Sequence, residues 1–248
     1  MSEAKPLAGR IALVTGASRG IGYQAAKGFA AAGAHVVAVA RTVGGLEELD
    51  DAIRKLGSSA TLVPLDLQDS PGIDRLGEAI FKRWGKLDVF LANAGVLGQM
   101  SPLGHVPPKV WDEVIAINVT ANWRLVRSLD PLLRKSDAGR AIFMSSGAAQ
   151  KCRPYWGPYS VSKAALEALA RTYAGETKNT AVRVVVVDPG KTRTAMRAKA
   201  MPGEDPKTLP KPSEIVPYLV EMASPFFART NTLFEFPTRT YRDWPDAA

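Results

Sequence analysis

The sequence predicts one α/β domain over residues 1–248, built on a doubly wound, mostly parallel sheet of about seven strands with helices on both faces. Two observations lead to this prediction. Short apolar runs of strand length alternate with longer segments of helical periodicity along the whole chain, with no linker and no internal repeat. The runs are also apolar at consecutive positions, as in strands that helices cover on both faces.

In the first half of the chain, apolar runs predict four strands and periodic segments predict three helices. Leu46, Leu49 and Ile53 recur at helical spacing, with acidic residues on the outer face. Ser70 is expected to cap the third helix, with Pro71 in its first turn. The expected strands are 10–14, 35–40, 61–65 and 87–92, and the expected helices are 23–32, 44–56 and 70–84.

The second half continues the alternation with less regular spacing. A long helical pattern over 109–134 contains Pro131, which should bend or end the helix. The proline-rich basic segment 191–212 is interpreted as loop or broken helix, and the chain from Arg242 onward as loosely held. The further strands are expected at 140–144, 182–187 and 232–236, and the further helices at 159–176 and 213–223.

Composition excludes several classes of protein. The net charge is +8, but the basic residues are scattered, so an anionic cofactor explains the charge better than nucleic acid does. No apolar run approaches the roughly 20 residues that span a bilayer, so no membrane partner is expected. Cys152 is the single cysteine and there are two histidines, so neither an intrachain disulfide nor a metal site is expected. The first residues lack the apolar core of a secretion signal, and the cytoplasm is the expected location.

A glycine-rich turn, Thr15-Gly-Ala-Ser-Arg-Gly-Ile-Gly22, connects the first strand to the first helix. Gly16 and Gly20 permit tight backbone geometry, and Gly22 lets the helix pack closely on the strand. The free N–H groups and the positive end of the helix dipole then face a pyrophosphate. The G-x-x-x-G-x-G spacing is wider than the common dinucleotide fingerprint, and an ordinary tight turn is the alternative.

The residue at the end of the second strand indicates which dinucleotide binds. A carboxylate there would accept hydrogen bonds from the 2′-hydroxyl of NAD and repel the 2′-phosphate of NADP. Here the strand ends in Arg41, and Arg19 should approach the same phosphate from the glycine turn. Unless these are simply two exposed surface arginines, the sequence predicts NADP(H), with NAD(H) less favoured.

Tyr159 and Lys163 begin the helix that follows the fifth strand, and four-residue spacing places them on one helical face. An ammonium beside a phenol should lower the pKa of the phenol, which suits a proton donor or acceptor near neutral pH. The spacing alone is weak evidence, because tyrosine and lysine four positions apart are common on helices.

Five motifs together resemble the short-chain dehydrogenase/reductase family, in the family's order and from about Leu7 to Phe236. The resemblance implies a Rossmann-type domain and an oxidoreductase that transfers a hydride between NADP(H) and a ketone, aldehyde or secondary alcohol. The five motifs are Thr15-Gly-x-x-x-Gly-Ile-Gly22, Asp66, Asn93-Ala-Gly95, Ser146 with Tyr159-x-x-x-Lys163, and Pro189-Gly190 with Thr194.

The same resemblance implies roles for individual residues. Tyr159 would be the general acid in carbonyl reduction, and Lys163 would bind the nicotinamide ribose. Ser146, thirteen positions before the tyrosine, would polarise the carbonyl, and Ser145 would be structural. Asn118 would hold a water in the proton relay, unless it is an ordinary helix-surface asparagine.

The resemblance also implies the cofactor contacts. Asp66 would touch the adenine, and Asn93 would border the adenosine ribose or stabilise the strand end. Thr192 stands where the family usually has Ile or Val, which weakens the expected carboxamide contact. The full expected set is Gly16, Ser18, Arg19, Gly20, Ile21, Gly22, Arg41, Thr42, Asp66, Leu67, Asn93, Ala94, Gly95, Tyr159, Lys163, Pro189, Gly190, Thr192 and Thr194.

Several alternatives remain open at this point. A redox-sensing protein that binds NADP(H) without turnover usually lacks the tyrosine or lysine, and both are present here. Lys191, Arg193, Arg197 and Lys199 could grip an anionic substrate or form a solvated basic loop. A homo-oligomer, with a tetramer favoured over a dimer, is expected through the helices at 109–134 and 159–176, where Ala164, Ala165, Ala168 and Ala170 would permit close approach.

Overall fold

The computed structural model describes residues 5–245, and their eight strands form one sheet in the order β3-β2-β1-β4-β5-β6-β7-β8. Neighbouring strands are parallel except β7 and β8, which are antiparallel. The strands are β1 (Ile11–Thr15), β2 (His35–Ala40), β3 (Ala60–Pro64), β4 (Val89–Ala92), β5 (Arg140–Met144), β6 (Arg183–Asp188), β7 (Thr232–Glu235) and β8 (Thr240–Asp243). The predicted fold class is confirmed.

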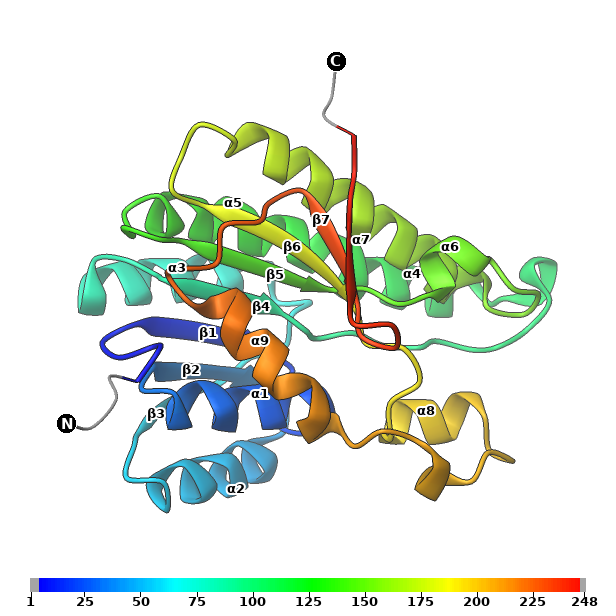
Figure 1. Ribbon diagram of the computed structural model, residues 1–248. Coiled ribbons are helices and arrows are strands. Elements are labelled where there is room, and N and C mark those ends of the chain that lie inside the picture. Colours follow the sequence, from blue (N-terminus) through cyan, green and yellow to red (C-terminus); the bar gives the residue numbers. More distant parts are fainter. Residues whose placement is uncertain (1–4, 246–248) are drawn as a thin grey trace.

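Helices cover both faces of the sheet, with α1, α2 and α9 on one face and α3, α5 and α7 on the other (Figure 1). No helix between residues 5 and 245 is both long enough and apolar enough to cross a membrane. The helices are α1 (Gly20–Ala31), α2 (Val43–Arg54), α3 (Ser70–Trp84), α4 (Pro108–Ile115), α5 (Ala121–Leu133), α6 (Ala148–Lys151), α7 (Gly157–Glu176), α8 (Ala195–Ala200) and α9 (Val216–Ala223).

Two apolar layers hold the helices to the sheet. Phe29 and Phe234 are fully buried in the layer under α1 and α9, and Phe90 and Phe143 meet edge to face in the other layer, with ring centroids 5.8 Å apart. Burying one such side chain contributes roughly 1.5–3 kcal/mol. This rigid sheet fixes the positions of the loops at its carboxyl edge.

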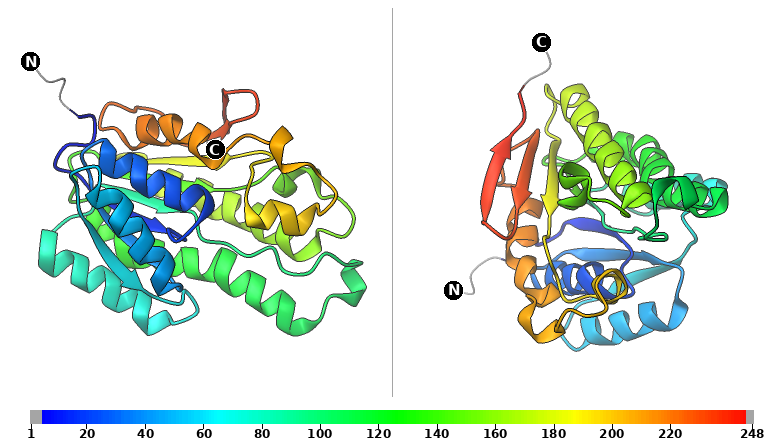
Figure 2. Two further views of the ribbon diagram at one scale, coloured as in Figure 1. Left: turned by 90° about the horizontal axis from the view of Figure 1, so that it is seen from below. Right: turned by 90° about the vertical axis from the view of Figure 1, so that its right-hand side faces the viewer.

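The strand order reverses direction between β1 and β4, because β2 and β3 lie on one side of β1 and the later strands on the other. After β1 the chain runs to α1 on one face of the sheet, and after β4 it runs to α5 on the other face. The two connections diverge and open a crevice at the carboxyl ends of β1 and β4, where ligands of such sheets bind. Helices α6 and α8 and the start of α4 lie beyond these ends, as both Figure 1 and Figure 2 show.

The structure corrects several details of the sequence-based interpretation. Strand β8 extends to Asp243, into the segment from Arg242 onward that was expected to be loosely held. It pairs with β7 through backbone bonds and has no apolar pattern that could reveal it. Asp69, not Ser70, caps α3, because its carboxylate accepts the N–H of Gly72 at 3.0 Å. Residues 1–4 and 246–248, which belong to the terminal segments considered above, lie outside the described residues.

Further differences concern the helices of the second half. Pro131 lies inside α5, two residues before its end, so the hydrogen bond that proline cannot donate is lost only in the last turn. The four-residue helix α6 lies between the expected strand 140–144 and the expected helix 159–176, where no element was expected. Between α4 and α5 the chain forms a π-helical turn, Ala116–Thr120, and such wide turns are frequent at functional sites.

A buried ion pair fastens the opposite, amino edge of the sheet. The guanidinium of Arg10 lies 3.5 Å from the carboxylate of Asp88, whose side chain is fully buried. Asp88 also accepts a hydrogen bond from Ser136 Oγ at 2.6 Å and pairs with Lys86 Nζ at 3.0 Å. Removing one partner of such a pair leaves an uncompensated buried charge.

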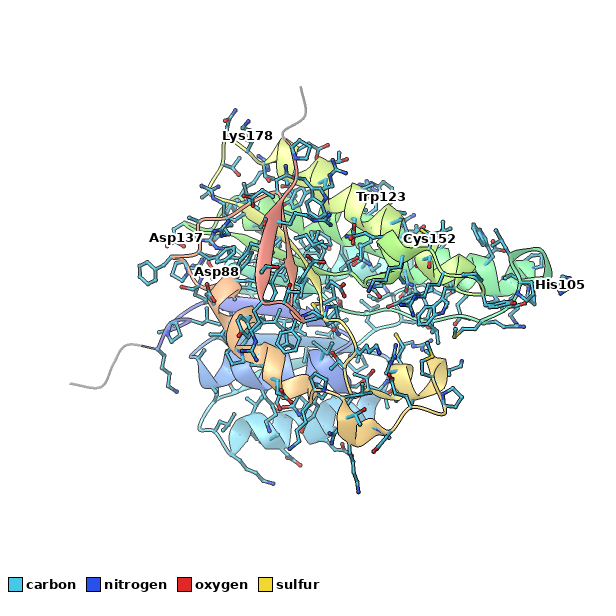
Figure 3. All side chains as sticks on the ribbon, turned by 45° about the vertical axis from the view of Figure 1, so that its right-hand side comes forward. Asp88, His105, Trp123, Asp137, Cys152 and Lys178 are labelled. Atoms are coloured by element: carbon cyan, nitrogen blue, oxygen red, sulfur yellow. The ribbon has the colours of Figure 1, made fainter. Side chains whose placement is uncertain are left out.

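We expect Asp88→Ala to lower the free energy of unfolding by about 3–5 kcal/mol, because Arg10 then stays buried without its carboxylate. Asp137 also pairs with Arg10, at 3.3 Å, but its side chain is 74% exposed, so Asp137→Ala should cost less than about 1 kcal/mol. Figure 3 shows both aspartates at the same edge of the molecule. Urea denaturation of the two variants measures the difference, and equal losses would contradict this account.

Candidate active site

The glycine turn has the geometry of a phosphate cradle. Gly16 and Gly20 adopt φ angles of +66° and +62°, which L side chains rarely adopt. A Cβ on Gly22 would collide with the carbonyl oxygen of Gly16, so only glycine permits this approach of α1 to the turn. Arg19 occupies the N-cap of α1 in extended geometry, and its side chain forms no capping hydrogen bond with residues 5–245. The first N–H groups of α1 are therefore oriented for an anion.

The Asn93–Gly95 motif braces this turn from the neighbouring strand. The Asn93 side-chain amide donates to the carbonyls of Thr15 at 2.9 Å and Gly16 at 3.3 Å. In return, Thr15 Oγ1 accepts the backbone N–H groups of Asn93 and Ala94, both at 3.0 Å. The two strand ends at the crevice are thus locked together, which establishes the strand-end role of Asn93.

Arg41 and Thr42 stand at the start of α2, on the same side of the crevice. Thr42 is the N-cap of α2, and its side chain makes no capping bond within the described part of the chain. The Arg41 guanidinium lies 3.9 Å from Asp66 Oδ2, and both side chains are about half exposed. A Cβ on Gly45 would meet Ser18, so α2 packs directly against the glycine turn.

Two residues of the expected set contribute apolar contacts. Leu67 is buried in the core layer of α3, and Ile21 packs against the layer of α1. Arg19 is exposed at the turn. The structure therefore brings the expected phosphate, ribose and adenine contacts to one edge of the sheet.

Tyr159 and Lys163 lie one turn apart at the start of α7, and both are buried. The Lys163 Nζ donates to the carbonyl of Met144 at the end of β5, at 2.7 Å, and lies 5.7 Å from the centre of the Tyr159 ring. The helix therefore holds the phenol and the ammonium together at the carboxyl end of the sheet.

The expectation that Lys163 lowers the pKa of Tyr159 is wrong for this structure. Burial raises the pKa of Tyr159 to about 12; the nearby Asp188 adds to the rise, and a hydrogen bond with Ser146 opposes it. Burial likewise lowers the pKa of Lys163 to about 8, and the Glu167 carboxylate opposes this shift. Burial is the largest cause of both shifts, so near pH 7 the phenol carries its proton.

The two serines after β5 have different partners. Ser146 shares a hydrogen bond with Tyr159, and its Oγ accepts the N–H of Ala148 at 3.2 Å. Ser145 is buried and donates to Glu167 Oε1 at 2.6 Å. Ser146 is thus the serine that lies with the phenol, as expected, while Ser145 fastens the end of β5 to α7.

Asn118 lies in the π-helical turn and is fully buried, which excludes the alternative of a helix-surface asparagine. Its Oδ1 accepts the N–H of Val96 at 2.8 Å, and its Nδ2 donates to the carbonyl of Val96 and to Ser162 Oγ, both at 2.9 Å. The side chain thereby ties the segment after β4 to α7. A water-holding role for Asn118 stays a prediction.

The segment after β6 folds over the same edge of the sheet. Gly190 donates its N–H to Asp188 Oδ1 at 2.9 Å, and Thr192 Oγ1 donates to the carbonyl of Pro189 at 3.0 Å. Thr194 caps α8 by accepting the N–H of Arg197 at 3.1 Å, and its methyl group lies beside Gly20. Pro189–Thr194 therefore reach the glycine turn from the far side of the crevice.

The cations of the basic segment are largely engaged within the segment itself. Arg197 forms two hydrogen bonds with the carboxylate of Glu204, and Lys191 Nζ lies 3.6 Å from the same group. Arg193 donates to the carbonyls of Lys207 and Leu209, both at 3.2 Å. These contacts favour a basic loop whose cations have no substrate role over a segment that grips an anionic substrate. No cluster of three or more His, Cys, Asp or Glu in the part of the chain described here is placed to bind a metal ion.

Comparison with known proteins decides the family. The sequence model of the family described as short chain dehydrogenase matches residues 10–205, well over half of the chain. The chain belongs to this family. It is an oxidoreductase family, and the expected resemblance is confirmed.

This short-chain dehydrogenase is 40% identical to the Escherichia coli (strain K12) oxidoreductase YciK over 230 residues, 91% of each chain. It is 33% identical to dehydrogenase/reductase SDR family member 4 of Bos taurus, over 79% of this chain and 70% of the relative. A short chain dehydrogenase of Shigella flexneri 2a complexed with NADP superposes with a TM-score of 0.91 at 38% identity, covering 95% of this chain and 100% of that one. A short chain dehydrogenase of Escherichia coli CFT073 complexed with NADPH superposes with a TM-score of 0.90 at 37% identity. The match covers 94% of this chain and 99% of that one.

Two residues at the centre of this short-chain dehydrogenase were not found from the sequence. Ser162 accepts from Asn118 and donates to the carbonyl of Tyr159 at 2.8 Å, so it links the π-helical turn to α7. Glu167 joins Ser145 to the helix that carries Lys163. Glu167 lies four residues after Lys163, on the same helical face, and that spacing is the signal that could have indicated it.

Proposed function

We propose that the chain is an NADP(H)-dependent oxidoreductase that reduces a ketone or aldehyde, or in reverse oxidises a secondary alcohol, with Tyr159 as the general acid and base. The observation that carries the proposal is the group formed by the half-buried Ser146 and the buried Tyr159 and Lys163 at the carboxyl end of β5. The S. flexneri and E. coli relatives complexed with NADP and NADPH support the choice of cofactor.

The residues at the crevice fit this cofactor. The glycine turn and the uncapped start of α1 suit the pyrophosphate, because a Cβ at Gly22 would fill the cradle. Arg41, Arg19 and the uncapped start of α2 offer positive charge and N–H groups that suit a 2′-phosphate. Lys163 donates to Met144 through one N–H, and its ammonium has further N–H groups to offer the nicotinamide ribose.

When bound, NADPH supplies the hydride. Ser146 and Tyr159 would donate hydrogen bonds to the oxygen of the carbonyl and orient it for reduction. Tyr159 then transfers its proton to the oxygen as negative charge develops there, since the phenol is protonated near pH 7. Asn118 would hold a water that returns the proton, in keeping with its place in the π-helical turn.

Tyr159→Phe should lower kcat for ketone reduction by at least about 100-fold and leave the Kd for NADPH nearly unchanged, because only the transferable proton is removed. Steady-state kinetics with a panel of ketones, together with NADPH fluorescence titration, separates the two effects. A Tyr159→Phe variant with normal kcat would refute the mechanism. Tight NADPH binding by the unmodified chain with no turnover of any ketone would favour an NADP(H)-sensing protein.

The unmodified enzyme should prefer NADPH over NADH by at least roughly tenfold in kcat/KM, because charge-assisted bonds to the 2′-phosphate supply more than the ~1.4 kcal/mol required. Arg41→Ala should remove most of that preference, because it should lower kcat/KM with NADPH and leave kcat/KM with NADH nearly unchanged. Arg54→Ala removes an exposed arginine at the far end of α2 and is the matched control. Equal use of both cofactors by the unmodified enzyme would contradict the assignment of Arg41 and Arg19.

We also propose that the enzyme is a homo-oligomer, with a tetramer favoured over a dimer. Trp123 on α5 is 50% exposed and Val161 on α7 is 43% exposed, and Ala164 and Ala168 of α7 are also exposed. Figure 3 shows Trp123 on this helical layer. Ala170, by contrast, is buried against the sheet and takes no part.

Light scattering should show an oligomer for the unmodified chain and a smaller species for the double variant Ala164→Arg with Ala168→Arg, because two added charges cannot be buried at a close helix contact. A monomer at working concentration for the unmodified chain would refute the proposal.

A further inference from the structure

A third apolar cluster surrounds the Tyr159 side chain, separate from the two layers of the core. Leu97 and Ala200 are buried in it with Tyr159, and four larger side chains pack against them while remaining partly exposed. Trp156 lies with its ring centre 6.1 Å from that of Tyr159. Ala148 of α6 also packs against this cluster. We use the name apolar mouth for six of its members around Tyr159, which are Leu97, Met100, Trp156, Met196, Ala200 and Met201.

The apolar mouth is built from three segments far apart in the sequence. Leu97 and Met100 follow β4, Trp156 precedes α7, and Met196, Ala200 and Met201 belong to α8 and its end. Ser101 donates its N–H to the carbonyl of Tyr155 at 3.1 Å, which ties the first segment to the second. Leu103 also packs against Gly157 at the start of α7. The walls around the reacting phenol are therefore held in place.

Two arginines of the segment that contributes α8 to this mouth are engaged in other contacts. Arg197, on α8 between Met196 and Ala200, is paired with Glu204, and Arg193 is bound to backbone carbonyls. Lys199 is exposed. An anionic substrate would thus meet apolar walls, while its carboxylate or phosphate would have to compete with Glu204 for Arg197.

Three of the chain's six methionines lie in the apolar mouth. Methionine is unbranched and polarisable, so it adapts to ligands of different shape, and it makes favourable contacts with aromatic rings. Exposed apolar surface beside a polar reacting group is the usual composition of a small-molecule site.

We propose that the substrate is an uncharged carbonyl compound with an alkyl or aryl group, whose apolar part lies among Met100, Trp156, Met196 and Met201 while its carbonyl meets Ser146 and Tyr159. This inference rests on the proposed function. It names the substrate class for the same site and excludes an anionic substrate as the preferred one.

The test compares 2-butanone, 2-hexanone, 2-octanone and 7-oxooctanoate as substrates with NADPH. Each added methylene should raise kcat/KM by two- to fourfold, as expected for burial of apolar surface. The last compound is 2-octanone with its terminal methyl replaced by a carboxylate, and its kcat/KM should be at least tenfold below that of 2-octanone.

A matched pair of variants on α8 locates the effect. Met196→Lys should lower kcat/KM for 2-octanone at least tenfold. It should also reduce or reverse the ratio of kcat/KM for 2-octanone to kcat/KM for 7-oxooctanoate. Ala198→Lys adds the same charge at an exposed position of the same helix. It should change neither kcat/KM for 2-octanone nor the ratio between the two substrates. Trp156→Ala, which adds no charge, should lower kcat/KM for 2-octanone more than for 2-butanone. Thermal melting and the Kd for NADPH verify that each variant is folded.

Equal or better use of 7-oxooctanoate by the unmodified enzyme, or a kcat/KM that does not rise with chain length, would overturn the inference and leave the proposed function standing. Equal effects of Met196→Lys and Ala198→Lys would also overturn it. A chain that binds NADPH and reduces no ketone or aldehyde would overturn the proposed function itself, and the inference with it.

Discussion

The burial of Lys163 is the constraint on which the rest of the site depends. An ammonium removed from water must be hydrogen-bonded, and here its Nζ donates to the carbonyl of Met144 at the last residue of β5. That bond fixes α7 against the end of the sheet, and so fixes Tyr159 one turn earlier on the same helix. A Cβ at Gly95, shortly after β4, would come tightly against Asn118 Oδ1, so a glycine there lets Asn118 keep its place in the site.

The polar groups around this bond form a connected brace. Asn118 ties Val96 to Ser162, Ser162 bonds the backbone of Tyr159, and Glu167 bonds Ser145. The first link joins the π-helical turn to α7, the second lies within α7, and the third joins α7 to the end of β5. A buried network with its donors and acceptors satisfied is rigid, which is the property a site for hydride and proton transfer requires.

Much of this arrangement could be predicted from the sequence, because it depends on local pattern. The glycine turn, the strand end at Arg41 and the four-residue spacing of Tyr159 and Lys163 each follow from residues near one another in the chain. What could not be predicted depends on tertiary contacts. Strand β8 has no apolar pattern and is stabilised by backbone pairing with β7. Arg197 and Glu204 are seven residues apart, and their hydrogen bond forms because the folded segment brings them together. The sequence predicts a lowered pKa for Tyr159, whereas burial raises it. The four-residue spacing shows that a lysine is near, but it does not show how deeply the two side chains are buried.

A charged, buried Lys163 and a protonated Tyr159 form the working state of the free enzyme in this mechanism. The most direct measurement is kcat/KM for NADPH between pH 7 and pH 10 at saturating ketone, because this ratio reports ionisations of the free enzyme. Burial lowers the pKa of Lys163 to about 8, so the ammonium loses its proton as the pH rises through that value, while the phenol with a pKa of about 12 stays protonated. The account predicts one descending limb near pH 8. A ratio that stays constant to pH 10, or that rises as a phenolate forms, would contradict it.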